Sequence, residues 1–195
     1  MKLYSHTLGT IIPRCGCIAA ALLLWLGATS SQAISIPGTT AWTDTGIFVP
    51  SGATLNIFAS GTVRYGPVTQ QVTGPNGTNY DGTQFFATAV VPNATIVSLI
   101  GKIGGTTSIG TGTLVPQGLA GNGVGFVGSS YSQFISTGGE LFLGFNDQVG
   151  QFGDNSGSFS ATVTVPEPSS AALAGLGALT FGTNFLKRKS AARKS

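Results

Sequence analysis

The sequence predicts an all-β fold, a single jelly-roll-like β-sandwich of about eight strands within residues 34–165. Glycine accounts for 24 of these 132 residues, well above its usual share of about 7%, and Thr, Ser, Val, Ile and Phe are abundant. No helical period of about 3.6 residues runs through the span, whereas short segments alternate apolar with polar residues. Turn residues interrupt these segments roughly every 8–12 residues, which is typical of a sandwich or a barrel.

Residues 1–33 are expected to be a secretory signal peptide. Lys2 and Arg14 supply the positive charge of its first region, and residues 18–28 form an apolar run that is too short for a comfortable membrane span. Small residues precede the expected cleavage site at Ala33. The alternative is an N-terminal anchor that is not cleaved.

Removal of this segment would leave a domain without cysteine or histidine side chains. Both cysteines and the one histidine lie within it, so residues 34–165 can form no disulfide, thiolate nucleophile, Ser-His-Asp triad or ordinary zinc site. The formal charge of +3 also comes from the chain ends, because only Arg64 and Lys102 are basic in the domain. Nucleic-acid binding requires a basic face on the folded domain, so no nucleic-acid partner is expected.

The expected strands are short and follow turn signals. In chain order they cover residues 54–58, 61–65, 86–91, 95–103, 123–127, 140–146 and 158–165. The last two show the clearest alternation, with an apolar residue at every second position. Each should bury one face and expose the other, as antiparallel strands commonly do.

Residues 146–159, NDQVGQFGDNSGSF, form the loop expected between these last two strands and carry an unusual density of oxygen ligands. Asp147 and Asp154 offer carboxylates, Asn155 offers an amide oxygen, and the glycines allow backbone carbonyls to turn inward. Oxygen ligands of which two are charged suit a hard cation such as Ca²⁺. The loop does not follow the D-x-D-x-D-G pattern of an EF-hand, and a solvated turn rich in Asp and Asn is the alternative.

The same stretch resembles the calcium loop N-D-x-x-G-x-[YF]-G-x-N-S-G-S-F of the PA-I galactophilic lectins, which are small bacterial β-sandwich lectins. SGTVRYGP at 60–67 resembles the strand of that family that ends in Tyr-Gly-Pro. A weaker match is GPNGTNYDGTQ at 74–84, followed by SLIGKIG at 98–104. The resemblance covers most of 41–165 and implies a galactose-binding-like β-sandwich that binds carbohydrate through calcium.

The resemblance also implies which residues form the site. The calcium ligands would be the side chains of Asp147, Asp154 and Asn155 and the backbone carbonyls of Tyr65 and Gln151. The sugar would contact Asp147, Gln151, Asp154, Gln84 and Asp81. This chain departs from the family at two of these positions, with Asp154 in place of an asparagine and Asp81 in place of a histidine that contacts the sugar's primary hydroxyl. Tyr80, or Trp42 if exposed, could instead stack on a pyranose ring or simply belong to the core.

Residues 166–195 are expected to be a sorting segment. Pro166-Glu167-Pro168 would end a preceding strand, a weakly apolar stretch follows, and Lys and Arg residues end the chain. This order resembles the PEP-CTERM sorting signal of exported bacterial proteins. It implies recognition by an exosortase-type enzyme, a transient membrane anchor through a C-terminal hydrophobic helix, and delivery to the cell surface or extracellular matrix. The alternative is a plain single-pass anchor.

Together these features predict an exported, surface- or matrix-sorted, calcium-dependent carbohydrate-binding protein that is not an enzyme. Its partners would be a carbohydrate or exopolysaccharide. The alternative is a structural protein of the extracellular matrix or exopolysaccharide, in which calcium only fixes the loop. A glycosidase is disfavoured, because Asp147 and Asp154 lie on one short loop and both are expected to hold the cation.

Overall fold

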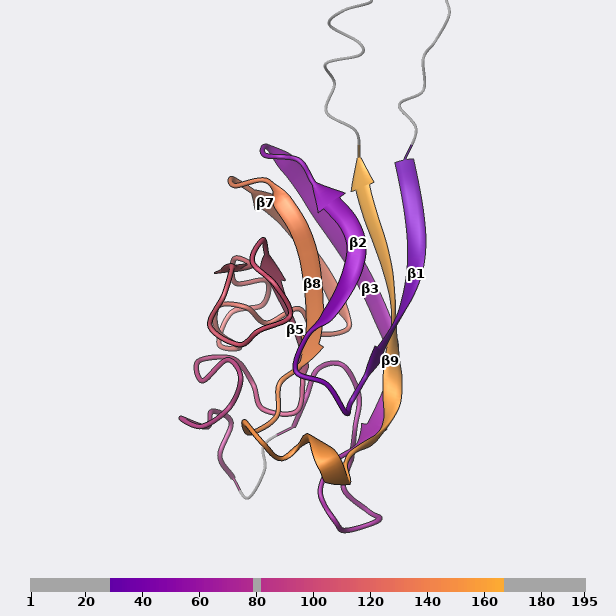
Figure 1. The fold of residues 1–195 in the computed structure, drawn as a ribbon, viewed down its shortest axis with the longest axis vertical. Helices are drawn as coiled ribbons and strands as arrows, with labels where there is room; N and C mark the ends of the chain where they lie inside the picture. The colour runs from indigo at the N-terminus through magenta and orange to yellow at the C-terminus, as the bar shows by residue number, and fades with distance from the viewer. Residues whose placement is uncertain (1–28, 79–81, 167–195) are drawn as a thin grey trace, which may run out of the picture.

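The computed structural model describes residues 29–78 and 82–166, which form two antiparallel β-sheets packed against each other (Figure 1). The strands are β1 (Thr29–Pro37), β2 (Thr43–Val49), β3 (Ala53–Arg64), β4 (Val72–Thr73), β5 (Leu99–Ile103), β6 (Thr113–Leu114), β7 (Ser130–Ile135), β8 (Gly139–Phe145) and β9 (Ser156–Pro166). One sheet has the order β1-β9-β3-β4, with β7 also paired to β3, and the other has the order β2-β8-β5-β6.

The predicted all-β sandwich is therefore confirmed. The one helical element of the described part is a single 3-10 turn, η1 (Phe152–Asp154). Within this part of the chain no helix is long and apolar enough to span a membrane. The expected signal and C-terminal helices, together with Glu167 and Pro168, lie outside the described residues.

The longest strand, β3, corrects the expected division into separate strands at 54–58 and 61–65. Gly61 lies within β3 at a φ of 95°, and a Cβ at this position would meet the Ser158 carbonyl oxygen at 2.7 Å. The glycine therefore permits β9 to approach β3 closely, and it does not end a strand. Continuous antiparallel pairing with β9 on both sides of Gly61 keeps β3 as one strand.

Other expected strands are shortened or replaced by turns. Residues 86–91 and 123–127 form turns that take part only in isolated β-bridges, and the strand expected over 95–103 is limited to β5. The strands β1, β2, β4, β6 and β7 were not predicted. The sequences of β2 and β7, TDTGIFV and SYSQFI, lack a regular apolar alternation, and the positions of these two strands are set by pairing with β8 and β3.

The main core lies between the two sheets. It combines fully buried residues of β3, β8 and β9 such as Leu55, Leu141 and Phe159. The rings of Phe145 and Phe159 join the two sheets at a centroid distance of 5.8 Å. Burial of each such side chain stabilises the fold by roughly 1.5–3 kcal/mol.

A second apolar cluster covers the other face of β8 and β5. Phe142 and Ile100 point away from the main core and pack with Trp42 and Phe126. The expectation that the strand now seen as β8 buries only one face is therefore wrong, because the loops before β5 and after β6 cover its second face. Residues 86–97 of the loop before β5 thereby lie at the end of β8.

The strand β1 pairs with β9 from Thr29↔Pro166 to Pro37↔Ser158. Ala33, the expected cleavage site, lies inside this strand opposite Thr162. Cleavage there would leave Ile36, which is fully buried, in its place in the core. The strand β9 ends at Pro166, where the expected Pro-Glu-Pro box begins.

The glycine-rich loop after β8 joins the last two strands, as expected, and these strands belong to different sheets. β8 belongs to the four-stranded sheet and β9 to the five-stranded sheet. The loop and η1 therefore close one end of the sandwich, whereas the first residue of β1 and the last residue of β9 lie at the other end (Figure 1).

Candidate functional site

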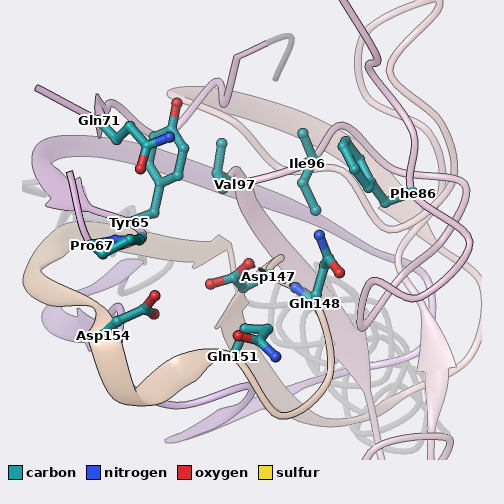
Figure 2. A pocket seen from close by; sticks show the side chains of 11 residues that line it. Tyr65, Pro67, Gln71, Phe86, Ile96, Val97, Asp147, Gln148, Gln151 and Asp154 are labelled. Atoms are coloured by element: carbon teal, nitrogen blue, oxygen red, sulfur yellow. Dashed lines mark hydrogen bonds between the residues drawn. The ribbon is translucent and has the colours of Figure 1, made fainter. Parts of the chain in front are cut away.

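A pocket of about 180 Å³ lies at the end of the sandwich that this loop closes (Figure 2). Its lining comes from three segments: the turn after β3, the loop before β5, and the loop between β8 and β9. The lining residues are Tyr65, Gly66, Pro67, Gln71, Phe86, Ile96, Val97, Asp147, Gln148, Gln151 and Asp154. The pocket thus combines two carboxylates with amide groups and apolar side chains.

Asp147 is a nearly buried carboxylate, only 9% exposed. The backbone N–H of Gln148 donates to its Oδ1 at 2.7 Å, and Nδ2 of Asn155 donates to its Oδ2 at 2.7 Å. Burial raises the pKa of Asp147, the two hydrogen bonds oppose this, and the neighbouring Asp154 carboxylate raises it further. The carboxylate is therefore held in one orientation, but its negative charge is only partly compensated.

Asn155 stands behind Asp147 and fixes its carboxylate. Its Nδ2 also donates to the carbonyl oxygen of Gly38 at 2.9 Å, and its Oδ1 accepts from the N–H of Gly66 at 3.3 Å. This buried side chain therefore ties the loop after β8 to the chain that follows β1 and to the chain that follows β3. Its oxygen retains a second lone pair.

The charges of the pocket fit a divalent cation. Asp154, at the end of η1, is exposed and faces the same pocket as Asp147. Within the described part of the chain, the charge that acts on Asp147 is this second carboxylate and not a lysine or arginine. The described residues contain no cluster of three or more His, Cys, Asp or Glu side chains, so a metal here would also need amide and carbonyl oxygens. Such a mixed set of oxygen ligands is the set that Ca²⁺ accepts.

The opposite side of the pocket carries its apolar side chains. Figure 2 shows Ile96, Val97 and Phe86 together on one side, across from Asp154 and Gln151, with the Gln148 carboxamide beside Ile96 and Phe86. Val97 has a φ of 51°, a conformation that costs a β-branched residue of order 1–3 kcal/mol. Its N–H donates to the Asn146 carbonyl oxygen at 2.7 Å, which helps to hold this backbone in place.

Asn146 supports this apolar side through its side chain as well. The side chain is fully buried. Its Nδ2 donates to three carbonyl oxygens, of Val91, Ala94 and Thr95, at 2.9–3.2 Å, and its Oδ1 accepts from the Val91 N–H at 2.9 Å. Asn146 is therefore a structural residue that fixes the loop before β5 against the end of β8.

The structure brings most of the predicted site residues together. Tyr65, Asp147, Gln151 and Asp154 line one pocket, and Asn155 contacts Asp147 directly. Gln84 is not among the lining residues. Its amide donates instead to Thr95 Oγ1, the Gly121 carbonyl oxygen and Asn122 Oδ1, at 3.0–3.1 Å.

Asp81 and Tyr80 lie outside the described residues, so the sugar contacts expected of them stay predictions. Trp42 is 5% exposed and belongs to the second apolar cluster, so it offers no ring to a ligand.

Several pocket residues were missed by sequence reasoning. Phe86, Ile96 and Val97 were assigned to expected strands, and Gln71 was not considered. The carboxamide oxygen of Gln71 is buried and has no hydrogen-bond partner among the described residues, although Gln71 lines the pocket. The only local signal was that Gln71 follows the Tyr-Gly-Pro turn by a few residues.

Comparison with known proteins finds a family model, a relative and a solved structure that are similar to this chain. A family model described as "PA-IL-like protein" matches residues 35–168. Lectin A of Photorhabdus laumondii subsp. laumondii is 30% identical over 126 residues, which cover 62% of this chain and 80% of that protein. A solved structure described as "EclA N-terminal domain; PllA-like lectin" is 24% identical, has a TM-score of 0.47, and is similar over 68% of this chain and 94% of that chain.

Proposed function

The chain belongs to the PA-IL-like protein family, and from this membership we propose that it is a calcium-dependent carbohydrate-binding protein. The relative named Lectin A supports a lectin-like domain that binds sugar and does not catalyse a reaction. The observation that carries the calcium part is the pair Asp147 and Asp154, two carboxylates that face one pocket without a basic partner among the described residues.

The cation would be held by the chain's own oxygen atoms. The side chains of Asp147, Asp154 and Asn155 and the backbone carbonyls of Tyr65 and Gln151 are the proposed ligands. The pocket holds two negatively charged carboxylates and partly excludes water. Burial disfavours their negative charge, and a bound divalent cation would compensate for it. Bound calcium would supply open coordination positions for sugar hydroxyl groups.

The chain's side chains would orient the sugar around those positions. Asp147, Gln151 and Asp154 line the pocket and offer acceptors and, in Gln151, a donor for sugar hydroxyls. The Gln71 carboxamide oxygen is a further acceptor without a partner among the described residues, and a buried acceptor is stabilised when a ligand hydroxyl donates to it. The hydrogen bonds of Asp147 to Gln148 and Asn155 keep its carboxylate in place before a ligand arrives.

We further propose that the protein is exported and sorted to the cell surface or the extracellular matrix. Residues 1–33 would act as the signal peptide, and residues 166–195 as a PEP-CTERM signal recognised by an exosortase-type enzyme. Both proposals rest on sequence patterns that lie almost entirely outside the described residues. The carbohydrate or exopolysaccharide partner would then be extracellular.

Calcium titration of the full chain tests the metal site. Wild type, Asp147→Asn and Asp44→Asn are purified in a detergent without a sugar headgroup and titrated with Ca²⁺ by calorimetry. Asp44 is an exposed aspartate on β2 and serves as the charge-matched control. We expect Asp147→Asn to weaken calcium binding by more than about 100-fold, because loss of a direct ligand should exceed the 10–100-fold effect of outer-shell changes.

A glycan panel then separates the lectin from a structural role. The calcium-loaded wild type is applied to the panel with and without EDTA. Glycan binding that EDTA removes supports the proposal. Calcium binding with no glycan bound leaves the structural alternative, and absence of calcium binding contradicts both the metal site and the calcium-dependent mechanism.

A further inference from the structure

The outer face of the five-stranded sheet exposes two aromatic rings. Along β3 and β7, residues buried in the main core, such as Leu55, Ile57 and Tyr131, alternate with residues that point outward. Phe58 on β3 and Phe134 on β7 point outward and are each 61% exposed. Large apolar side chains that share one exposed face on neighbouring strands mark a contact surface.

The two rings are set apart along the strands, with a polar pair between them. Phe58 lies opposite Ser130, which precedes Phe134 by four residues on β7, a separation of about 13 Å at about 3.3 Å per residue. Between the rings, Asn56 and Ser132 lie opposite each other, and the Ser132 hydroxyl donates to Asn56 Oδ1 at 2.7 Å. The face therefore presents a ring, a hydrogen-bonding pair and a second ring in one row.

The face carries hydroxyl groups and almost no charge. The strands β1, β7 and β9 contain no Asp, Glu, Lys or Arg, and on β3 the one charged residue is Arg64, at the last position. The cross-strand neighbours of Phe58 are Ser130 and Thr162, and the neighbour of Phe134 is Thr54. A neutral face fits a neutral partner, whereas nucleic acid and anionic lipid surfaces require clustered basic side chains.

This pattern does not suit a second copy of the chain. A stable protein interface buries about 800 Å² on each partner, and its centre is more apolar than its rim. Here the position between the two rings is occupied by the polar pair Asn56 and Ser132. A second flat sheet would bury this pair and the surrounding hydroxyl groups at a cost in lost hydrogen bonds to water.

A neutral polysaccharide matches each of these features. The carbon-bound hydrogens of a pyranose form an apolar face that can pack on an aromatic ring, while its hydroxyl groups lie around the edge. A chain laid along the strands would place sugar rings on Phe58 and Phe134 and hydroxyl groups between them. Asn56 and Ser132 can both donate and accept hydrogen bonds there.

We propose that this outer face, centred on Phe58 and Phe134, binds a linear neutral polysaccharide without calcium. The face is separate from the pocket, because no residue of β3, β7 or β9 lines the pocket. Phe58 precedes the lining residue Tyr65 by seven residues, about 23 Å along an extended chain. The proposal therefore goes beyond the calcium-dependent function and does not depend on it. Each ring contact is weak, and two on one polysaccharide chain strengthen each other.

Sedimentation with insoluble neutral polysaccharides in the presence of EDTA tests the proposal. The full chain, in a detergent without a sugar headgroup, is mixed with increasing amounts of microcrystalline cellulose, chitin or curdlan, and the unbound protein is measured. EDTA keeps calcium from the pocket, so the calcium-dependent site does not contribute. We expect wild type to bind at least one of the three polymers. Phe58→Ala and Phe134→Ala should each weaken this binding by about 3- to 10-fold, the effect of one aromatic contact.

Matched variants assign the binding to this face. Phe48→Ala is the control, because Phe48 is 67% exposed and lies on β2 in the other sheet, so loss of its ring should leave binding unchanged. Phe58→Tyr keeps an aromatic ring and should retain the binding that Phe58→Ala loses. Thermal unfolding is measured for every variant, which separates loss of the contact from damage to the fold.

The results separate this proposal from the calcium-dependent function. Binding in EDTA that requires the rings of Phe58 and Phe134, but not that of Phe48, supports the proposal. Absence of binding to all three polymers, or binding that the alanine variants retain or lose equally, overturns it. A dimer in analytical ultracentrifugation that Phe58→Ala dissociates would show that a second copy covers the face, which also overturns it. Calcium titration and the EDTA-sensitive glycan binding test the proposed function independently of all these outcomes.

Discussion

Two adjacent residues at the end of β8, Asn146 and Asp147, support different sides of the pocket. Asp147 presents its carboxylate to the polar side, held by Gln148 and Asn155. Asn146 faces the other way and binds the backbone of residues 91–97 through its side chain and its carbonyl oxygen. Two neighbouring residues therefore help to fix the two sides of the pocket.

Replacement of Asn146 by alanine should be strongly destabilising. The change leaves the N–H of Val91 and the carbonyl oxygen of Ala94 without their buried partner, and each unsatisfied group costs about 1–3 kcal/mol. The carbonyl oxygens of Val91 and Thr95 lose one hydrogen bond each and keep those from the Ala94 N–H and Ser98 Oγ. We expect a loss of about 3 kcal/mol or more in the free energy of unfolding, measured by urea denaturation. Asn56→Ala is the control, since its hydrogen bond to Ser132 is exposed, and it should cost less than about 1 kcal/mol. Equal losses in the two variants would contradict the role given to Asn146.

Three polar residues of the pocket were predicted from the sequence and its apolar residues were not, for a physical reason. Asp147, Gln151 and Asp154 lie within one short loop, so local sequence places them together. Ile96 and Val97 reach the same pocket through tertiary contacts, among them the hydrogen bonds of Asn146, about 50 residues later, to their segment. Periodicity assigns such residues to a strand, since it has no information on a hydrogen bond between distant segments.

The unpartnered oxygen of Gln71 gives a separate prediction. Gln71→Met keeps the length of the side chain and removes a buried acceptor that has no partner among the described residues. We expect the free energy of unfolding without ligand to rise by about 1 kcal/mol, while sugar affinity falls. Gln70→Met, at the exposed neighbouring position, should change neither quantity. A clear loss of stability in Gln71→Met would show that the amide is satisfied in the folded protein.

At the scale of elements, β5 and β8 depart most from simple strand rules because both of their faces are buried. Lys102 on β5 is 1% exposed, which is unusual for a lysine. Its Nζ donates to the Ser108 carbonyl oxygen at 2.9 Å and to Thr111 Oγ1 at 3.2 Å. It also lies 4.6 Å from the centre of the Trp42 ring, within the range of a cation–π contact.

The buried lysine should make stability depend on pH in a defined direction. Burial lowers the pKa of Lys102 below its ordinary value of 10.5, so the fold favours the neutral amine more than the unfolded chain does. The contribution of Lys102 to the free energy of unfolding therefore rises as pH increases through the lowered pKa, and it levels off above 10.5. The difference in unfolding free energy between wild type and Lys102→Met should accordingly grow in favour of wild type toward alkaline pH.

The measurement compares the two proteins by urea denaturation from about pH 7 to about pH 10. The range stops there because Tyr131 also affects stability at higher pH. Burial raises the pKa of Tyr131 in the folded protein, so the free energy of unfolding falls once the tyrosine of the unfolded chain ionises. A difference between the two proteins that stays constant over this range would mean that Lys102 titrates like an exposed lysine.

Over the whole molecule, the pocket and the ends of the described chain lie at opposite ends of the sandwich (Figure 1). β9 begins next to Asn155 and ends at Pro166, which pairs with Thr29. With 11 residues in β9 and about 3.3 Å per residue, the pocket lies about 35 Å from the point where residues 167–195 begin. An anchor in that segment would hold the pocket away from the membrane.

This arrangement predicts a difference in accessibility on a membrane. In a chain with Cys15 and Cys17 replaced by serine, Val149→Cys places a thiol on the loop beside the pocket, where Val149 is 54% exposed. Thr137→Cys places a thiol at an exposed position after β7, near the opposite end. On full chain reconstituted in lipid vesicles, a bulky maleimide-polymer should label residue 149 as fast as in detergent and residue 137 more slowly. Slower labelling of residue 149 alone would reverse the inferred orientation.

An outward-facing pocket matters because single sugar contacts are weak. Many chains on one surface gain avidity only if their pockets can engage the same polysaccharide at once.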